Sequence, residues 1–391
     1  MPLETSILNI YGFQIEKIEG RDPIVISVRY ILEAICPHCQ SKDLRIKDTF
    51  NRQLRHESVG SRKTVLDLKT HKYRCRSCGR YFNQRIPGIL PYKRNTEEFR
   101  YEVFQKHNDG ICQTKLASRM EIGPATIERW YHDYLERIVA EMSNNLCPRV
   151  LGIDEHFFTR KKGYATTLCD LEKHRVHDVV LGRSEMALET YFRRLPAKER
   201  VSVVVIDLSE TYRSIIKKHF PNAKIVSDRF HVIRLINHHF LKLWQQIDPV
   251  GRKNRGLLSL MRRHEKNLSA EQKIKLQRYF TEHPELASIY AFKQNLCRLM
   301  LIKHRTRKGC RRLLPIFLKY IEQLKGSMLE PFVVLGKTLE SWSEEVVRMW
   351  RFTRSNGITE GFHTKMEMIS RRAYGFRNFE NYRLRVKALC S

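Results

Sequence analysis

The clearest pattern of hydrophobic and polar positions lies between residues 150 and 228. Because alternate residues of a strand face opposite sides, its apolar runs and alternating segments predict strands over 150–154, 164–171, 176–181, 201–207 and 223–226. An amphipathic helix is predicted over 186–195, and another precedes the last strand. The β-branched run up to Ile206 is typical of a strand buried on both faces. The predicted order is βββαβαβ, with Asp154 ending the first strand and Asp207 the fourth.

Weaker patterns predict further units on either side. Short β-rich runs fill residues 1–90, and helical spacing covers residues 97–143 with one interruption at Gly123-Pro124. After residue 228 the chain is basic and mostly helical to about residue 350, and a helix near 359–369 and a basic tail follow. The domains predicted are 1–90, 95–143 and 148–391, the last with a helical insertion over about 235–350.

Composition and charge point to a partner. The 391 residues suffice for two or three folded units, and 72 Lys and Arg against 42 Asp and Glu give a formal net charge of +30. Such an excess is self-repelling unless a polyanion shares the surface, so nucleic acid is the expected partner. A membrane is disfavoured, because no stretch approaches the roughly 20 apolar residues of a spanning helix. Since residues 1–11 also lack an export signal, we expect a cytoplasmic, nucleoid-associated protein.

Four of the ten cysteines form two pairs, Cys36-Pro-His-Cys39 and Cys75-Arg-Ser-Cys78. Two such turns supply the four thiolates of a tetrahedral structural Zn²⁺ site, with His38 outside it. The 35 residues between the pairs exceed the usual spacing of about 15 to 20, so an extended β-hairpin must join them. The alternative is a set of unrelated buried or redox cysteines. The sequence therefore predicts one zinc ion in an N-terminal β module.

Residues 114–135 have the spacing of a helix-turn-helix. A short helix over 114–120 and a turn over 121–123 precede a second helix, which begins with Pro124 at a position where its missing N–H costs nothing. One face of the second helix is apolar, and we expect Thr126, Arg129 and His132 on the other face to reach the DNA major groove. The alternative is an ordinary helical hairpin.

The acids that end two strands predict a metal site. In the order βββαβαβ, which is the ribonuclease H arrangement, the first and fourth strands are neighbours, so Asp154 and Asp207 are expected side by side. Adjacent carboxylates repel unless a proton or a cation lies between them, and Mg²⁺ prefers oxygen ligands. Two such ions can activate the attacking oxygen and stabilise the leaving one in phosphoryl transfer. A helix that carries Glu360 in its first turn offers a third acid, but spacing alone leaves Glu367, Glu155, Asp170 and Asp228 open as ligands.

The stretch from residue 251 to residue 320 is strongly basic. It holds 18 Lys and Arg against 4 acids, a local net charge of +14, with one cluster at Arg305, Arg307, Lys308, Arg311 and Arg312. We expect this cluster to contact the phosphate backbone of DNA, the alternative being a solvated helical face. Four aromatic residues of the stretch and its approach are expected in the core rather than stacked on flipped bases: Trp244, Tyr279, Tyr290 and Phe292.

At these residues the chain resembles the ISL3 family of bacterial insertion-sequence transposases. The similarity rests on the cysteine pairs, the helix-turn-helix, and five short motifs: Gly152-Ile153-Asp154-Glu155, Val205-Ile206-Asp207, Ser227-Asp228-Arg229-Phe230-His231, Ser355-Asn356-Gly357 before Glu360, and 371–379. The resemblance implies a ribonuclease H-like α/β catalytic core with Asp154, Asp207 and Glu360 as catalytic triad. It also implies accessory roles for Asp228 and His231, although a helix cap and a packed histidine explain that pair equally well. His363 stands where family members often carry Asn.

The resulting expectation is a multidomain enzyme that acts on double-stranded DNA as a homo-oligomer. It would bind the ends of its insertion sequence and the target, and cut and join strands with two Mg²⁺ (or Mn²⁺) ions held by Asp154, Asp207 and Glu360. A plain metal-dependent nuclease and an inactive, transposase-derived DNA-binding regulator are the rival functions. A plain nuclease would not need an N-terminal module that recognises DNA sequence. Loss of any of the three acids would have favoured the regulator.

Overall fold

The computed structural model describes residues 8–142, 146–352 and 357–391. The chain divides into two compact units, Met1–Ile138 and Val139–Ser391. Among the described residues, none of the helices combines the length and the apolar character that crossing a lipid bilayer requires.

The first unit begins with a sheet in the strand order β1-β2-β4-β3, with β5 on β4. Its strands are β1 (Phe13–Glu19), β2 (Ile24–Tyr30), β3 (Leu44–Val59), β4 (Arg62–Cys75) and β5 (Tyr81–Asn83). The β3–β4 hairpin is long and antiparallel, and its register pairs Leu44 with Cys75. Alternate apolar residues such as Leu54, Leu66 and Leu68 form its core. The extended hairpin expected between the cysteine pairs is confirmed.

Three helices complete the first unit: α2 (Glu97–Asn108), α3 (Gln113–Met120) and α4 (Pro124–Met142). Thr96 caps α2, and its hydroxyl accepts the N–H of Phe99 at 3.2 Å. Glu121 ends α3 in the left-handed conformation, with φ 51°. α4 continues about seven residues beyond the predicted end near Leu135, because the apolar and charged positions keep their helical spacing to Met142.

The second unit contains a mixed sheet in the order β10-β9-β6-β7-β8. Its elements follow as β6 (Val150–Thr159), β7 (Gly163–Asp170), β8 (Arg175–Leu181), α5 (Glu185–Arg194), β9 (Val203–Ile206), α6 (Glu210–His219) and β10 (Lys224–Ser227). β9 is parallel to both β6 and β10, and β7 is antiparallel to its neighbours β6 and β8. The predicted order βββαβαβ and the adjacency of the first and fourth strands are therefore confirmed.

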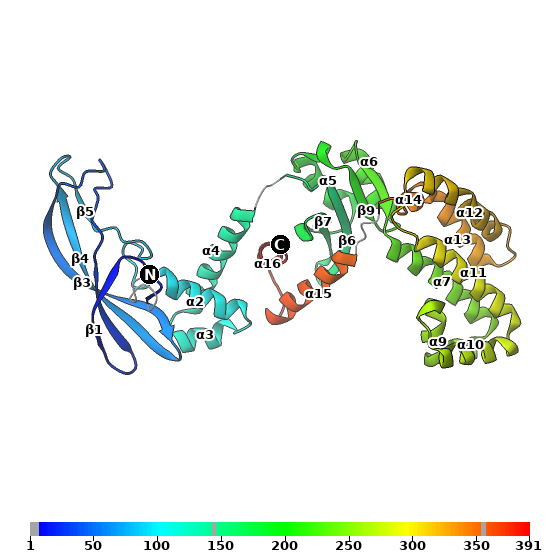
Figure 1. Ribbon diagram of the computed structural model, residues 1–391, viewed down its shortest axis with the longest axis horizontal. Coiled ribbons are helices and arrows are strands. Elements are labelled where there is room, and N and C mark those ends of the chain that lie inside the picture. The colour runs from blue at the N-terminus through cyan, green and yellow to red at the C-terminus, as the bar shows by residue number, and fades with distance from the viewer. Residues whose placement is uncertain (1–7, 143–145, 353–356) are drawn as a thin grey trace. The chain divides into compact units, whose positions relative to one another are not determined.

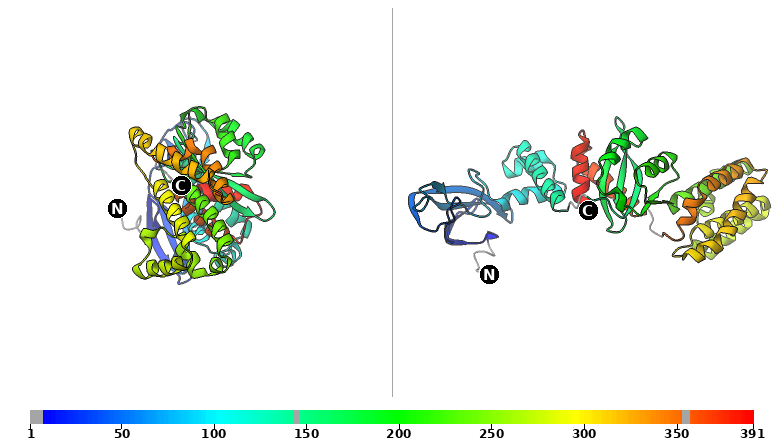
Figure 2. Two further views of the ribbon diagram at one scale, coloured as in Figure 1. Left: turned by 90° about the vertical axis from the view of Figure 1, so that its right-hand side faces the viewer. Right: turned by 90° about the horizontal axis from the view of Figure 1, so that it is seen from above.

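A helical insertion follows β10. Figure 1 and Figure 2 show it as a group of helices beside the sheet, made of α7 (Arg229–Ile247), α8 (Pro249–Lys253), α9 (Arg255–Arg262), α10 (Ala270–Glu282), α11 (Pro284–Met300), α12 (Arg307–Lys325), α13 (Glu330–Ser341) and α14 (Ser343–Arg348). Trp244 and Tyr290 are buried in it, which confirms their assignment to the core.

Buried arginines fix the insertion to the sheet. Arg229, at the root of α7, donates to the carbonyl oxygens of Met300 at 2.9 Å and Met349 at 2.7 Å. Arg213 of α6 makes two 2.9 Å hydrogen bonds to the carboxylate of Glu345, which is 2% exposed. These contacts hold the two ends of the insertion against the strands that carry the acids.

The chain then returns to the sheet through α15 (Gly357–Arg372) and α16 (Phe379–Leu389). The tail after α15 is basic, as expected, but it also forms an amphipathic helix, which the sequence analysis did not predict. Phe379, Tyr382 and Val386 recur at helical spacing and are buried, and α16 packs on β8. The N–H of Val176 donates to the carbonyl of Cys390 at 2.8 Å, which closes this edge of the sheet.

Candidate active site and metal centre

The four paired cysteines come together at the end of the β3–β4 hairpin. Their sulfur atoms all lie within 4.8 Å of one another, with 3.7 Å between the sulfurs of Cys36 and Cys78 and 3.5 Å between those of Cys39 and Cys75. The backbone N–H of Cys78 donates to Cys75 and lowers the pKa of that thiol to about 6. His38 is exposed and pairs with Arg80, outside the cluster as expected. Four soft ligands at this spacing fit a tetrahedral zinc ion.

Asp154 and Asp207 stand level on neighbouring parallel strands. The register pairs Gly152 of β6 with Val205 of β9, and each aspartate follows two residues later in the chain. Asp154 is 6% exposed, and Asp207 lies in the turn between β9 and α6. β6 does not end at Asp154 as expected but continues to Thr159, because the following residues pair with β7. Both aspartates therefore follow the last β6–β9 pair at the same end of these two parallel strands.

Electrostatics set this pair apart. The pKa values of Asp154 and Asp207 are both raised to about 6, chiefly by burial; the charge of Asp228 contributes in the same direction, and His231 acts in the opposite direction. The N–H of Glu155 donates to Asp154 at 2.8 Å. Within the described part of the chain, Oδ1 of Asp207 is buried and has no hydrogen-bond partner. Burying a carboxylate oxygen without a hydrogen-bond donor costs free energy, and binding a divalent cation would offset that cost.

Asp228 extends the row by one strand. Ser227 of β10 pairs with Ile206 of β9, so Asp228 is level with Asp207. It is 1% exposed and stands at the N-cap of α7, where its side chain makes no capping hydrogen bond. Its carboxylate lies 4.0 Å from Nε2 of His231. The side chain of Asp228 therefore does not cap α7. The charges of Asp228 and His231 instead act on the pKa of Asp154 and Asp207.

Two other acids that the sequence left open have structural partners. Glu155 is ion-paired with Arg183 at 2.8 Å. Asp170 accepts the N–H groups of Glu172 and Lys173, and it pairs in register with Leu151 at the far end of β6. Asp170 thus lies away from the row of Asp154, Asp207 and Asp228.

α15 places Glu360 on an exposed position of its first turn. Among the described residues, the cysteine cluster alone brings three or more metal-ligating side chains within 4.8 Å, so the oxygens of Asp154, Asp207 and Glu360 are not gathered to that distance. Glu367 is also exposed and is ion-paired with Arg371 at 2.6 Å. Ser355 and Asn356, which precede this helix in the family-like motif, lie outside the described residues.

A hydrogen-bonded chain fixes α15 on the sheet. The hydroxyl of Thr167 is bonded to Nδ1 of His156 at 2.9 Å and to Nε2 of His363 at 3.1 Å, so it donates to one ring and accepts from the other. Nε2 of His156 is bonded to the hydroxyl of Tyr382 at 2.8 Å. Burial lowers the pKa of His363 to about 4 and that of His156 to about 3, which keeps both rings neutral. His363 thereby anchors the helix that carries Glu360.

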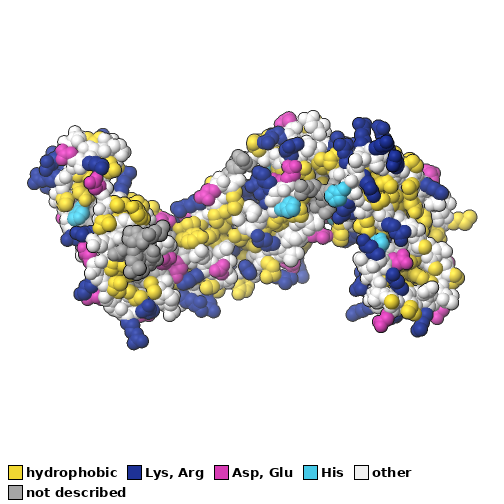
Figure 3. Space-filling model, viewed as in Figure 1, with side chains coloured by type: hydrophobic (Ala, Val, Ile, Leu, Met, Phe, Trp, Pro, Cys, Tyr) yellow, Lys and Arg dark blue, Asp and Glu magenta, His cyan; other side chains and the backbone are white. Residues whose placement is uncertain are grey.

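The expected DNA-reading residues lie on α4 and α12. Arg129 is exposed, and Thr126 and His132 are half-buried on the face away from the buried Ile127 and Trp130. The basic cluster at the start of α12 is exposed at each predicted position: Arg305, Arg307, Lys308, Arg311 and Arg312. Lys and Arg side chains outnumber acids on the visible face of the insertion (Figure 3).

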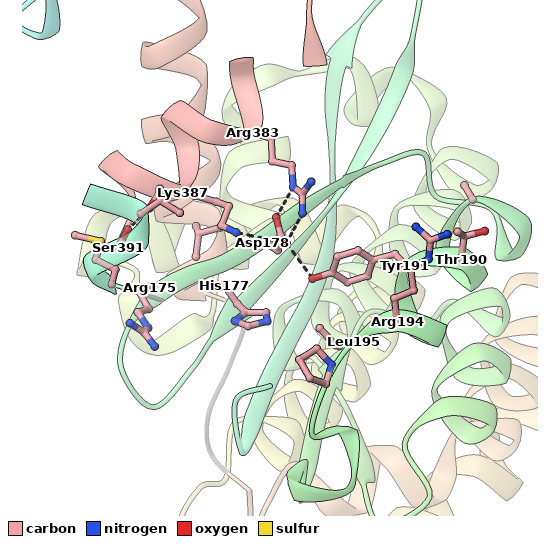
Figure 4. Close-up of a pocket in the computed structure, with 15 residues that line it drawn as sticks. Arg175, His177, Asp178, Thr190, Tyr191, Arg194, Leu195, Arg383, Lys387 and Ser391 are labelled. Carbon is pink, nitrogen blue, oxygen red and sulfur yellow. Dashed lines mark hydrogen bonds and ion pairs between the residues drawn. The ribbon is translucent and has the colours of Figure 1, made fainter. Parts of the chain in front are cut away.

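Sequence reasoning missed a cavity of about 580 Å³ between β8, α5 and α16. Figure 4 shows Arg383 and Tyr191 converging there on Asp178, which is 6% exposed. Arg383 makes two 2.7 Å hydrogen bonds to the carboxylate, and the hydroxyl of Tyr191 donates at 3.2 Å. The partners lie 205 residues apart, so only a helical pattern in residues 379–389 would have hinted at them.

Comparison with known proteins decides the family. A family model for the ISL3 type, described as "Transposase", matches residues 151–386, which is more than half of the chain. The chain belongs to the ISL3 family of transposases. A second model, for the zinc-finger of transposases IS204, IS1001, IS1096 and IS1165, matches residues 33–78. The four-cysteine cluster is thus the zinc ribbon of an ISL3 transposase.

Individual ISL3-type relatives are similar over most of their length. The chain is 24% identical over 392 residues to the transposase for insertion sequence element IS1001 of Bordetella parapertussis, which covers 96% of this chain and 95% of the relative. It is 21% identical to the transposase for insertion sequence element IS1557 of Mycobacterium tuberculosis, over 68% of this chain and 65% of that protein.

Proposed function

We propose that this ISL3 transposase cuts and joins DNA strands at a site formed by Asp154, Asp207 and Glu360. The observation that carries the proposal is the level placement of Asp154 and Asp207 on adjacent strands, with one oxygen of Asp207 buried and unsatisfied. The catalytic unit is proposed to be ribonuclease H-like, a name supported by the sheet order β10-β9-β6-β7-β8.

Two divalent cations, Mg²⁺ or Mn²⁺, are proposed to bind these acids and polarise the phosphodiester and the attacking oxygen. The residues would hold the ions through carboxylate oxygens, which are the ligands that hard cations prefer. Asp228 and His231 are proposed to tune the pair, since both act on the pKa of each strand acid. Glu360 of α15 is proposed as the third carboxylate that would hold the ions, and His363 is proposed to position that helix through Thr167.

DNA recognition is proposed to reside in the first unit and in the insertion. α3 and α4 are proposed to act as a helix-turn-helix, in which Arg129, with Thr126 and His132, reads the element ends. The exposed cluster at the start of α12 is proposed to hold the DNA backbone, because exposed cations bind phosphates without reading the base sequence. A homo-oligomer assembled on DNA is proposed to hold the two element ends.

The test is a reaction with Mg²⁺ and duplexes that carry the element ends, in which cleavage and joining are measured separately. Asp154→Asn, Asp207→Asn and Glu360→Gln should each lower both activities by at least about 10²-fold, since each removes an anionic ligand from a site worth several kcal/mol. Binding to the ends should stay within about twofold. Glu367→Gln, on the same helix and equally exposed, is the matched control.

The outcomes separate the rival functions. If the protein cleaves uncut ends but joins neither uncut nor pre-cut ends to a target, it is a nuclease. End binding without either activity would make it a regulator. Activity that survives Glu360→Gln but not Asp228→Asn would move the third ligand from α15 to the N-cap of α7.

A further inference from the structure

Two adjoining cavities of about 310 and 320 Å³ lie within the helical insertion, among α7, α11 and the turn after α9. Both are lined by His264, Lys266 and Leu301, so they form one cleft, which we call the α11 cleft. Against the single acid Glu265, its described lining carries five cations: Arg262, Lys266, Lys273, Lys293 and Arg298.

Lys293 lies at the buried side of the α11 cleft. It is 2% exposed, and its Nζ donates to the carbonyl of Met261 at 2.7 Å and lies 5.3 and 5.2 Å from the ring centres of Phe240 and Tyr290. None of these groups carries a full negative charge. Met261 is in the last turn of α9, where the helix dipole supplies only about half a charge. A buried ammonium without an anion is unfavourable, so a group of opposite charge would stabilise it.

The mouth of the cleft adds to the positive potential. Lys266, Lys273 and Arg298 are exposed, and Arg298 donates to the neutral side chain of Asn295 at 3.2 Å. Burial lowers the pKa of His264, and the charges of Lys266, Arg298 and Lys293 lower it further. The cations therefore act together on a common volume of the cleft.

We propose that the α11 cleft binds a phosphate of the DNA backbone, with Lys293 on its inner side and Lys266 and Arg298 at its mouth. The inference rests on the proposed action on DNA. A phosphodiester supplies the negative charge that Lys293 lacks, and cations hold it without reading sequence. The site is separate from the cluster that begins at Arg305 on α12, which does not line the cleft.

The experiment uses the full chain with zinc bound and without added Mg²⁺, so that DNA binding is measured without cleavage. Lys293→Met keeps the apolar stem and removes the charge, and the double variant Lys266→Gln/Arg298→Gln changes exposed side chains only. Lys337→Gln removes one exposed charge from α13 of the same insertion and is the control. Each protein is titrated with element-end duplex, random duplex and inorganic phosphate, the duplexes at several salt concentrations, and its melting temperature is recorded.

Lys293→Met should weaken binding to both duplexes equally, about fivefold near 0.15 M salt, and reduce the salt slope by about 0.9, as expected for one lost phosphate contact. The double variant should show a slope change of the same size, because it removes contacts to the same phosphate, and Lys337→Gln should bind like the wild type. Lys293→Met should melt no lower than the wild type, which separates lost binding from lost folding.

Three results would overturn the assignment. If both cleft variants match Lys337→Gln in affinity and slope while the wild type binds DNA, the cleft has no role in binding. A loss confined to the element-end duplex would identify base reading instead of backbone contact. Equal DNA binding together with lost binding of inorganic phosphate would assign the cleft to free phosphate. A wild type that binds neither duplex would refute the proposed function itself.

Discussion

The ion pair between Asp178 and Arg383 holds α16 on β8, and Asp178→Asn tests how strongly. The change keeps the shape of the side chain but removes its charge, so the 2.7 Å hydrogen bonds from Nε and Nη2 of Arg383 lose their anionic acceptor. Hydrogen bonds to charged groups contribute about 1.5–3 kcal/mol each. The amide oxygen of Asn retains one acceptor, and the Arg383 side chain, 30% exposed, recovers part of its hydration. We expect a loss of about 2–4 kcal/mol in the free energy of unfolding.

Thermal and urea unfolding measure this loss. For a folded unit of this size, about 2–4 kcal/mol corresponds to a fall of roughly 5–15 °C in melting temperature. Glu380→Gln is the control, because Glu380 also contacts Arg383, at 3.1 Å, but its side chain is 68% exposed, and the expected loss is less than about 1 kcal/mol. If Asp178→Asn and Glu380→Gln lose the same free energy of unfolding, the ion pair between Asp178 and Arg383 does not hold α16 on β8.

The pH dependence gives a second readout of the same pair. Burial alone would raise the pKa of Asp178, but the hydrogen bonds from Arg383 and the charges of Lys387 and Arg383 outweigh it and hold the pKa below its usual value. A group whose pKa is lower in the folded state contributes stability that is complete above its unfolded value, near about 4, and is lost as the pH falls through the folded value. The difference between wild type and Asp178→Asn should therefore be constant from about pH 5 to 8 and shrink below about pH 4.

Three further changes test other parts of the molecule. Cys39→Ser should lower the zinc content from one ion per chain and destabilise the first unit, as elemental analysis and melting would show; full zinc content would contradict the four-thiolate site. Arg129→Ala should reduce discrimination between element ends and random duplex by about 1–3 kcal/mol in binding titrations, and equal losses on both would contradict base reading. Thr167→Val should lower cleavage while leaving end binding intact, and Thr167→Ser should restore it; a restored fold without restored cleavage would contradict the positioning role of His363.

The sequence predicts the strands of the second unit well, because their patterns are local. The continuous β-branched run up to Ile206 and the alternation of apolar and polar residues after Tyr164 can both be recognised from adjacent positions in the sequence. The level placement of Asp154 and Asp207 follows from that order, since adjacent parallel strands share a register. The zinc ribbon is equally accessible, because the Cys-x-x-Cys spacing encodes the geometry of each turn.

The remaining features depend on partners far apart in sequence. β6 continues past Asp154 only because residues such as His156 and Phe157 pair with β7, which a hydrophobic run cannot reveal. The contact that anchors α15 joins His363 to Thr167, almost 200 residues away. In the sequence, Lys293 cannot be distinguished from the other cations of a basic stretch. Only the structure shows that its ammonium lies against the rings of Phe240 and Tyr290.

The insertion also determines the order in which a growing chain can become competent. The zinc ribbon and the helices up to Ile138 form a contiguous unit that is synthesised first, whereas the strand acids precede α15 by the whole length of the insertion. Long-range pairing of this kind forms late, since the intervening loop must close before its contacts contribute. A chain interrupted between Ser227 and Gly357 would therefore carry the proposed DNA reader without the helix that bears Glu360. If the proposed function holds, such a fragment would occupy element ends without cutting them and would compete with the full chain.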